Sequence, residues 1–358
     1  MPSKSRAEWP GVSYVMPVLN EALYLRAAIE TITAQEYPGR WELVLALGPS
    51  DDSTLEIAKE IAAADDRIRY VMNPETDIPI GLNLAVQESR FEIIVRVDAH
   101  SELSPGYTVR AVEALERSGA ANVGGLMHAA GNSPFQASVA RAYNSRFGLG
   151  GGAYHAGGPE GPSESAYLGV FRRAVITEVG GYDETLRRGE DWELNLRIRR
   201  AGHTVWFDPS LTVTYWPRAS WSDLSQQFRS TGVWRGELVR RYGAGNSVRF
   251  FAPPVLVIAL ILALVLGITT AGIALLSVAP LALVWAAGLS ALAPIAYLGF
   301  LGFAFLRDSG SIRSRAQFVT VIATMHISWG LGFLRGLLFG AGNNRDRSRI
   351  APRPRTRH

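Results

Sequence analysis

A run of 57 residues without a charged side chain, residues 250–306, constrains this chain more than any other feature of its sequence. As a single helix the run would be about 85 Å long, whereas the hydrocarbon core of a bilayer is about 30 Å thick. Two membrane-spanning helices therefore fit, near residues 251–278 and 281–306, with a turn at Ala279-Pro280. A buried helix of a soluble protein is rarely this long and this free of charge. We therefore predict an integral, multi-pass membrane protein.

Arginines on both sides of the uncharged run predict its orientation. Arg240, Arg241 and Arg249 precede the run, and three more arginines follow within residues 307–317. Positively charged loops tend to stay on the cytoplasmic side of a membrane. Both flanks are therefore predicted to be cytoplasmic, and the protein is predicted to lie in the inner or plasma membrane.

A third apolar stretch, residues 318–340, contains His326 and Arg335 and precedes a basic tail, residues 341–358. If the stretch spans the membrane, the tail lies outside, contrary to the positive-inside tendency. The alternative is a re-entrant or interfacial helix. In either case the basic flanks suit anionic lipid head groups and an acceptor linked to polyprenyl phosphate. Nucleic acid is not an expected partner, because the tail lacks interleaved aromatic residues.

The first part of the chain is predicted to be a cytoplasmic domain, residues 11–249. Residues 1–10 are polar, are predicted to be disordered and lack the apolar centre of a signal peptide. Residues 250–340 are predicted to form a second region of helices that span the membrane or lie at its interface. Cysteine is absent, which excludes disulfides, thiolate metal sites and a catalytic thiol.

Strands and helices alternate through the first hundred residues, which predicts an α/β fold with a parallel sheet and helices on both faces. The helix after the first strand is predicted to begin at Asn20 as N-cap, with Leu23 on its apolar face. The predicted strands are residues 12–16, 41–47, 69–72 and 91–97, and the predicted helices are residues 21–32, 55–64 and 80–89.

Asp98 and His100 follow the fourth predicted strand, where ligands collect in open α/β sheets. A carboxylate and an imidazole two positions apart can point at the same divalent cation. Carboxylate oxygen suits Mg²⁺ or Mn²⁺, and imidazole is compatible with Mn²⁺. The alternative is an aspartate that caps a turn beside a surface histidine.

The second strand leads into the turn Asp51-Asp52-Ser53-Thr54. Carboxylates there repel phosphate but can accept hydrogen bonds from ribose hydroxyls and from the N–H of a uracil ring. The alternative is a plain helix cap. A G-x-G-x-x-G fingerprint is missing after the first strand, which argues against a dinucleotide oxidoreductase.

Two later segments also carry candidate functional residues. Residues 148–165 are rich in Gly, Pro and Ser and contain Tyr154 and His155, which favours an active-site loop over a plain linker. The apolar pattern after Trp192 predicts a helix with Asp191 in its first turn, where the helix dipole favours a carboxylate. A structural N-cap is the alternative role for Asp191.

Four motifs, in this order and spacing, resemble those of family 2 glycosyltransferases. These motifs are Pro17-Val18-Leu19-Asn20-Glu21, the Asp52 turn, Asp98-Ala99-His100 and Gly189-Glu190-Asp191-Trp192-Glu193-Leu194. The resemblance covers roughly residues 11–240 and implies a GT-A fold that transfers sugars from nucleotide-diphosphate donors with inversion. The Asp-Ala-His variant and the apolar C-terminal part are most similar to the succinoglycan-biosynthesis ExoA-type members, which extend lipid-linked glycans on the cytoplasmic face.

The resemblance implies a role for each matching residue. Asp191 would be the catalytic base, with Glu190 beside it, and Asp98 and His100 would hold Mn²⁺ or Mg²⁺. The donor nucleotide would contact Pro17, Val18, Asn20, Glu21, Asp52, Asn83 and Asp98. An acceptor and diphosphate loop would contain His155, Gln226, Arg229, Trp234 and Arg235.

The chain departs from the family pattern at three positions. Leu47 stands where the family usually has an aspartate at the end of the second strand. His100 replaces the second acid of Asp-x-Asp, and the Trp does not directly follow Arg229.

The expected function is inverting transfer of a sugar, with UDP-hexose favoured as donor, to a membrane-embedded, polyprenyl-linked glycan in polysaccharide or cell-envelope biosynthesis. The alternatives are a non-catalytic membrane protein that binds nucleotide or a partner, a polyprenyl-phosphate sugar synthase, and a transporter. Two or three spans are too few for a monomeric transporter, although an oligomer could evade this limit.

Overall fold

The computed structural model describes residues 9–243, 247–276, 281–342 and 344. Residues 1–8 and 345–358 of the predicted terminal segments, and the predicted turn at Ala279-Pro280, lie outside the described residues.

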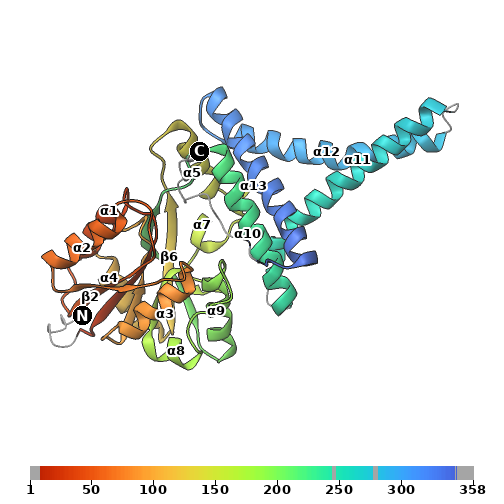
Figure 1. Ribbon diagram of the computed structural model, residues 1–358. Helices are drawn as coiled ribbons and strands as arrows, with labels where there is room; N and C mark the ends of the chain where they lie inside the picture. The colour runs from red at the N-terminus through yellow and green to blue at the C-terminus, as the bar shows by residue number, and fades with distance from the viewer. Residues whose placement is uncertain (1–8, 244–246, 277–280, 343, 345–358) are drawn as a thin grey trace, which may run out of the picture. The chain divides into compact units, whose positions relative to one another are not determined.

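The described residues form two compact units. Residues 9–130 and 143–217 build an α/β unit, and residues 131–142 and 218–344 build a helical unit (Figure 1).

The α/β unit alternates strands and helices in its first half, as the sequence predicts. Its strands are β1 (Val12–Val18), β2 (Trp41–Leu47), β3 (Ile68–Met72), β4 (Ile93–Arg96), β5 (Ser101–Leu103), β6 (Asn122–Ala129), β7 (Gly161–Pro162), β8 (Tyr167–Arg172) and β9 (Val205–Tyr215). Its helices are α1 (Leu25–Thr33), α2 (Thr54–Ala64), α3 (Ile78–Glu88), α4 (Tyr107–Ser118), α6 (Arg146–Leu149), α7 (Ala153–Ala156), α8 (Arg173–Glu178) and α9 (Glu190–Arg200).

The strands form one mixed sheet in the order β3-β2-β1-β4-β8-β6-β9-β5, with β7 paired to β9. β1 pairs in parallel with β2 and with β4, and β2 pairs in parallel with β3. β8 runs antiparallel to β4 and to β6, and β5 runs antiparallel to β9. The predicted parallel sheet is therefore correct for β1–β4, and the later strands add antiparallel pairs that the sequence interpretation did not include.

Helices cover both faces of the sheet, as predicted. Successive residues of β1 point to opposite faces, so Tyr14 and Met16 pack in one buried cluster and Val15 packs in another. The first cluster includes residues of α1, α2 and α4, and the second includes residues of α3, α8 and α9. Continuous burial on both faces explains why β1, β2 and β4 are almost uninterrupted apolar runs.

The structure corrects the predicted start of the first helix. α1 begins at Leu25 after Tyr24, and Asn20 does not cap it. Asn20 instead has a positive φ of 56° and holds the loop after β2, while Leu23 is 89% exposed rather than part of the apolar face. Asparagine tolerates this left-handed conformation better than most residues, so a turn competes with the cap at this position.

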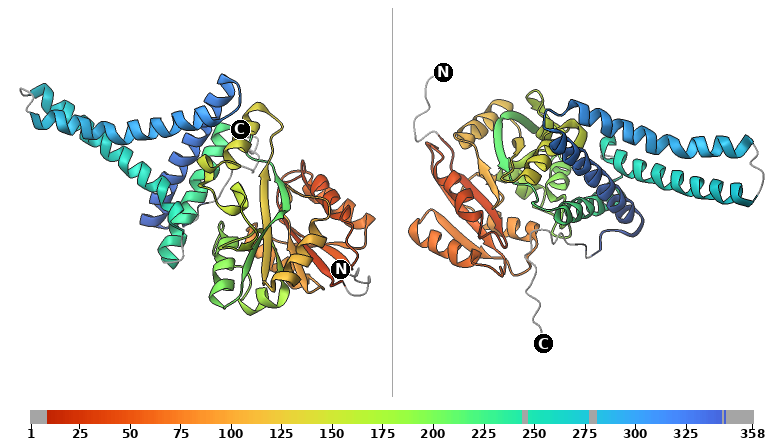
Figure 2. Two further views of the ribbon diagram at one scale, coloured as in Figure 1. Left: turned by 180° about the vertical axis from the view of Figure 1, so that it is seen from behind. Right: turned by 90° about the horizontal axis from the view of Figure 1, so that it is seen from above.

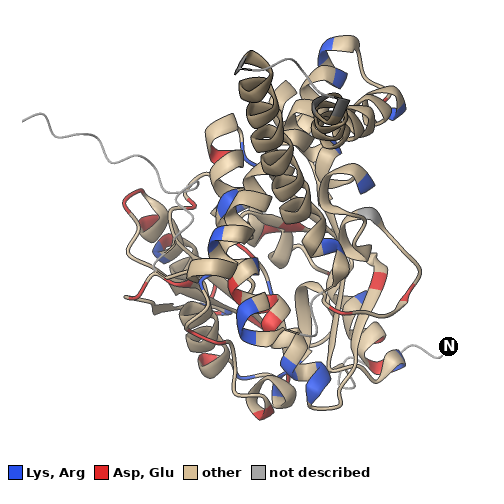
Figure 3. Cartoon of the chain, turned by 90° about the vertical axis from the view of Figure 1, so that its right-hand side faces the viewer, with Lys and Arg blue, Asp and Glu red and all other residues tan. Residues whose placement is uncertain are grey.

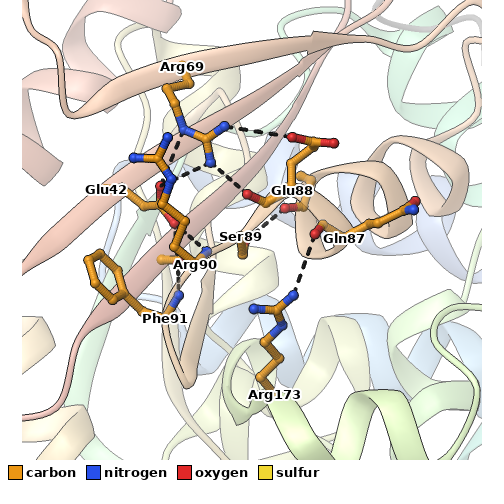
Figure 4. A network of polar contacts seen from close by, with 10 residues as sticks. Glu42, Arg69, Gln87, Glu88, Ser89, Arg90, Phe91 and Arg173 are labelled. Atoms are coloured by element: carbon orange, nitrogen blue, oxygen red, sulfur yellow. Dashed lines mark hydrogen bonds and ion pairs between the residues drawn. The ribbon is translucent and has the colours of Figure 1, made fainter.

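A buried carboxylate fastens the amino-terminal edge of the parallel strands. Glu42, at the start of β2, accepts hydrogen bonds from the Ser13 hydroxyl at 2.8 Å and from the Arg90 backbone N–H at 2.6 Å. Arg69 pairs with it at 3.0 Å, and the Glu42 side chain is only 4% exposed (Figure 4). One side chain thus links β1, β2, β3 and the turn before β4.

We predict that Glu42→Ala destabilises the protein without altering the kinetics of the folded fraction. The substitution leaves buried donors unsatisfied, which costs about 1–3 kcal/mol, and thermal unfolding of the detergent-purified chain measures it. Glu60→Ala is the matched control, because the Arg26–Glu60 pair is largely exposed and such pairs contribute little. Equal stability of the two variants would contradict the anchoring role of Glu42.

Within its described residues the helical unit contains five α-helices. Three helices there are long and apolar enough to cross a membrane, at Val248–Leu275, Val284–Arg307 and Ile312–Phe339. The α-helices of the unit are α5 (Pro134–Tyr143), α10 (Trp221–Tyr242), α11 (Ala252–Leu276), α12 (Leu281–Arg307) and α13 (Ile312–Phe339), with a short 3-10 turn, η2 (Val248–Phe251), before α11.

α11 and α12 lie side by side (Figure 2) and carry no charged residue before Arg307 (Figure 3). Large apolar side chains such as Leu264 and Leu292 are more than 60% exposed along them, as expected for helices that face lipid.

The third apolar helix differs from the other two. α13 begins at Ile312, before the apolar stretch of residues 318–340, and the Ser311 side chain caps it by accepting a hydrogen bond from the Ser314 N–H. In the most apolar part of α13, 44% of the residues are buried, compared with 11% and 6% in the corresponding parts of the first two apolar helices. The buried face of α13 packs against α10.

Glycines bring α10 and α13 into backbone contact. A Cβ added to Gly336 would overlap the Val233 carbonyl oxygen, and one added to Gly332 would overlap that of Arg229. Reciprocally, a Cβ on Gly232 would overlap the Trp329 carbonyl oxygen. Small residues four positions apart on both helices allow this approach, as in many membrane helix pairs.

We predict that Gly336→Leu pushes α10 and α13 apart and lowers the stability of the helical unit by about 1–3 kcal/mol, the usual cost of overpacking. Thermal unfolding in detergent measures the change. Gly302→Leu on α12 is the matched control, because a Cβ there meets nothing within 4 Å. If the two leucine variants unfold alike, the glycine contact does not hold the helices together.

Candidate active site

The loops after β1 and β2 are tied together at the carboxyl edge of the sheet. The backbone N–H of Asn20 donates to the Ser50 hydroxyl at 3.0 Å, and the Asn20 side-chain oxygen accepts from the Asp51 N–H at 2.7 Å. The N–H of Glu21 donates to the Thr54 hydroxyl at 2.8 Å. Parallel strands end at the same edge, so these bonds form one continuous polar rim.

Asp52 holds this rim from the α2 side. Its carboxylate accepts from the Thr54 N–H at 3.1 Å and from the Ala22 N–H at 3.2 Å. Asp52 lies one residue before the N-cap Ser53, which makes no side-chain capping bond, and the Asp52 side chain joins the two loops. Pro17 and Val18 belong to β1 itself, where they pair with β2.

His100 lies beside Glu21 of the first loop. The distance from His100 Nδ1 to Glu21 Oε1 is 2.8 Å, and the two side chains are 18% and 9% exposed. A carboxylate at this position favours the tautomer in which Nδ1 donates its proton, which leaves the lone pair of Nε2 to bind a metal. The structure thus gives Glu21 a partner that the sequence did not predict.

Asp98 is connected to the start of α9 through Arg96. Arg96 Nε donates to Asp98 Oδ1 at 3.2 Å, and Arg96 Nη2 donates to Glu190 Oε1 at 2.9 Å. The Arg96 and Glu190 side chains are 6% and 8% exposed. The predicted cation position and the predicted catalytic helix therefore share one buried ionic network.

The network perturbs the pKa values of its members. Burial alone would lower the pKa of the Arg96 guanidinium, but the charges of Asp98 and Glu190 outweigh it and raise that pKa. Burial raises the pKa of the Glu190 carboxyl, and the charge of Arg96 opposes this rise. Burial likewise raises the pKa of the nearby Tyr182 hydroxyl, so it stays protonated at neutral pH.

Glu190 and Asp191 are adjacent in sequence but differ in environment. Gly189, with a positive φ of 78°, turns the chain into α9, and Glu190 then points inward to Arg96. Asp191 is half-buried, and its carboxylate accepts from the Trp192 N–H at 2.7 Å. Asp191 is therefore the more accessible of the two carboxylates.

Asn83 lies against the turn that leads to α9. Its side-chain amide donates to the Tyr182 carbonyl oxygen and to Glu184 Oε1, both at 2.9 Å. Its side-chain oxygen accepts from the Tyr182 N–H at 2.8 Å. The structure thus places Asn83 as a support of the turn before α9, and its predicted contact with the donor stays a prediction.

The predicted acceptor-loop residues fall in both units. His155 lies on α7 in the α/β unit, where its ring centroid is 4.2 Å from that of Tyr154 and 6.2 Å from that of Tyr143. The segment predicted as a loop therefore contains a short helix, and it also contains β7.

The other predicted acceptor-loop residues lie on α10 of the helical unit. Gln226 and Arg229 are exposed. Trp234 and Arg235 are buried: Trp234 Nε1 donates to the Asn344 carbonyl oxygen at 3.1 Å, and the Arg235 guanidinium lies 4.0 Å from the Phe250 ring centroid. These contacts indicate that Trp234 and Arg235 help to hold the helical unit together.

The donor set fits a divalent cation that completes its shell with substrate oxygens and water. Within the described part of the chain no group of three or more His, Asp or Glu side chains forms a complete metal cage. Asp98 and His100 supply one carboxylate and one imidazole, and Glu21 orients the imidazole as carboxylates do behind metal-bound histidines. Mg²⁺ and Mn²⁺ commonly bind through few protein groups plus phosphate oxygens.

Sequence reasoning missed Arg96. The available signal was a charged residue inside an otherwise apolar strand, two positions before Asp98. A buried arginine needs carboxylate partners, but the sequence does not tell which of the 32 acidic residues they are.

The chain is similar to several known glycosyltransferases. The family model described as Glycosyl transferase family 2 matches residues 13–180. The succinoglycan biosynthesis protein ExoA of Rhizobium meliloti is 32% identical over 90% of this chain and 94% of its own.

A second relative, from Methanococcus voltae, is a dolichyl N-acetyl-alpha-D-glucosaminyl phosphate 3-beta-D-2,3-diacetamido-2,3-dideoxy-beta-D-glucuronosyltransferase. It is 22% identical over 64% of this chain and 74% of its own.

Among solved structures, the mannosyltransferase PcManGT of Pyrobaculum calidifontis, in complex with GDP-Man and Mn²⁺, has a similar fold. Its TM-score is 0.57 at 16% identity, and the match covers 94% of this chain and 89% of that one. This likeness supports the predicted GT-A fold. The matching motifs, the family model and the relative that shares almost the whole length agree: this chain belongs to glycosyl transferase family 2.

Proposed function

We propose that this glycosyltransferase moves a hexose, with inversion, from a UDP-sugar to a sugar on a polyprenyl-linked acceptor, in the biosynthesis of a polysaccharide. One observation carries the proposal: Asp98, where the donor diphosphate is expected, and Glu190, the neighbour of Asp191, are held by the same buried guanidinium. The donor and acceptor ends of a displacement reaction would thus lie within one network.

The proposed reaction is a single displacement. The Asp191 carboxylate accepts the proton of an acceptor hydroxyl, whose oxygen forms a bond to the anomeric carbon of the donor. The bond from that carbon to the diphosphate oxygen breaks on the opposite face, and the nucleoside diphosphate departs. A divalent cation held by Asp98 and His100 would supply the positive charge that stabilises the departing diphosphate.

The polar rim would hold the nucleoside. The loops after β1 and β2 carry acceptors, including Asp52, beside backbone groups that are already fixed by hydrogen bonds. Fixed acceptors bind ribose hydroxyls and base N–H groups at little entropic cost. Leu47, where the family usually has an aspartate, removes one acceptor and makes this rim less polar.

The apolar helices and the relatives support the proposed acceptor and its location. Exposed apolar helices suit an enzyme whose acceptor is anchored in a membrane, and arginines on both sides of the first two helices favour a cytoplasmic catalytic unit. The names of the relatives refer to succinoglycan biosynthesis and to a dolichyl-linked sugar phosphate. These names favour extension of a lipid-linked glycan over synthesis of a polyprenyl-phosphate sugar.

The proposal is tested by nucleotide release from a panel of UDP-, GDP- and dTDP-sugars. The detergent-purified chain is assayed with Mn²⁺ or Mg²⁺, with and without a polyprenyl-diphosphate-linked sugar. We expect metal-dependent release from one UDP-hexose that the acceptor stimulates. Release that polyprenyl phosphate alone supports equally well would instead identify a polyprenyl-phosphate sugar synthase.

Asp191→Asn is expected to lower kcat about 10²–10⁴-fold, the usual contribution of a general base, because the amide cannot accept the acceptor proton. Donor affinity, measured by calorimetry with UDP and Mn²⁺, should stay within about twofold of the wild type, since uncharged Asn keeps nearly the same shape. Asp65→Asn is the control, because Asp65 pairs with Arg67 beyond the end of α2. A variant Asp191→Asn that keeps most of its activity would show that another group is the base.

His100→Ala is expected to remove the nitrogen coupling in the electron spin-echo spectrum of bound Mn²⁺. Glu21→Gln should keep the coupling but weaken Mn²⁺ binding about 10-fold, as loss of an orienting carboxylate typically does. His128→Ala is the matched control, because His128 is exposed on β6. Nitrogen coupling that survives in His100→Ala would place the cation elsewhere.

A further inference from the structure

Arg96 faces the catalytic helix because of the alternation along β4. Ile93 and Val95 point into the cluster that contains α1, α2 and α4, whereas Ile94 points into the cluster that contains Leu194 and Tyr182. Side chains of a strand alternate between faces, so Arg96 follows Ile94. Arg96, the last residue of β4, thus reaches the start of α9 on the face of the sheet that α9 covers.

The guanidinium makes two directed contacts with two different segments. Nε donates to Asp98, in the loop after β4, and Nη2 donates to Glu190, in the first turn of α9. The guanidinium is planar and rigid, so two such bonds restrict how far the two carboxylates can move relative to each other. The ring of Tyr182 lies 6.0 Å from the guanidinium carbon, and Asn83 holds the Tyr182 backbone.

The charges explain why this link is needed. Asp98, Glu190 and Asp191 gather around the single positive charge of Arg96 in a largely buried site. Without that charge the carboxylates would repel one another, and buried carboxylates without a partner are strongly disfavoured. The first turn of α9 would then move away from the loop after β4 and carry Asp191 with it.

We propose that Arg96 is a positioning residue, which acts through Glu190 to set the separation between the donor-binding carboxylate Asp98 and the base Asp191. This assignment rests on the proposed function. It gives Glu190 the role of a support for α9 and leaves Asp191 as the group that touches the acceptor.

The test is a double-mutant cycle with Arg96→Met and Glu190→Met in the full-length, detergent-purified chain. Small displacements of reacting groups cost about 10²-fold in rate, so each single variant should lower kcat by about that factor. For Glu190→Met the donor KM and the affinity for UDP with Mn²⁺ should change less than about threefold, because Asp98 keeps its bond to Arg96. The double variant should be no slower than the slower single variant, because both remove the same link.

A second arm covers the case in which Arg96→Met does not fold. Arg96→Lys keeps the charge but cannot direct two bonds from one plane, so it should fold and still show the loss of kcat. The matched control is Glu42→Ala, because the Glu42 side chain is 4% exposed and pairs with Arg69 at 3.0 Å at the opposite edge of the sheet. This control variant should lower the unfolding temperature but not kcat per folded molecule.

Each other outcome has a definite meaning. If the double variant loses kcat by the product of the two single-variant factors, Arg96 and Glu190 act independently and the assignment is wrong. If the single variants keep the kcat of the wild type per folded molecule, Arg96 has only a structural role and the assignment is wrong as well. A wild-type chain that binds no UDP with Mn²⁺ and turns over no donor would overturn the proposed function and this assignment together. If the wild-type chain turns over donor and the variants Arg96→Lys and Glu190→Met have the same kcat, the assignment alone is overturned.

Discussion

Parallel pairing of β1 with β2 and β4 is the constraint on which the rest of this site depends. It brings the ends of three strands to one edge, so that Glu21, Asp52 and Asp98, which are far apart in sequence, lie on adjoining loops. The register itself is held at the opposite edge, where buried Glu42 binds Ser13 and Arg90. A buried carboxylate at the opposite edge of the sheet from the proposed site thus aligns the strands whose loops carry the proposed site residues.

The site is built from hydrogen-bonded side-chain pairs, and within the described residues it has no complete metal cage. Glu21 orients His100, and Arg96 holds both Asp98 and Glu190. These bonds offset part of the cost of burying the side chains. In the proposed reaction, Nε2 of His100 would bind the cation on the donor side, and the half-buried Asp191 would meet the acceptor. We infer that a metal and a diphosphate complete the charge balance when the donor binds.

Much of this could be predicted from the sequence, and the failures have physical causes. The apolar runs of β1, β2 and β4, the two long uncharged helices and the position of Asp191 in the first turn of α9 are local patterns, and all are confirmed. Asn20 was wrongly expected to cap a helix, because a capping asparagine and one in a left-handed turn look alike in sequence. The Arg96–Glu190 pair spans 94 residues, and the α10–α13 contact depends on glycines whose partners are about 100 residues away. Only the folded chain reveals such distant pairs.

The central claim is a direct displacement in which Asp191 serves as base and no sugar becomes attached to the enzyme. The most direct measurement is the anomeric configuration of the transferred sugar, read from the one-bond carbon–proton coupling at the anomeric carbon in the NMR spectrum of the product. A donor with an α linkage should give a product with a β linkage. A product that keeps the configuration of the donor would contradict the displacement and the role of Asp191 as its base.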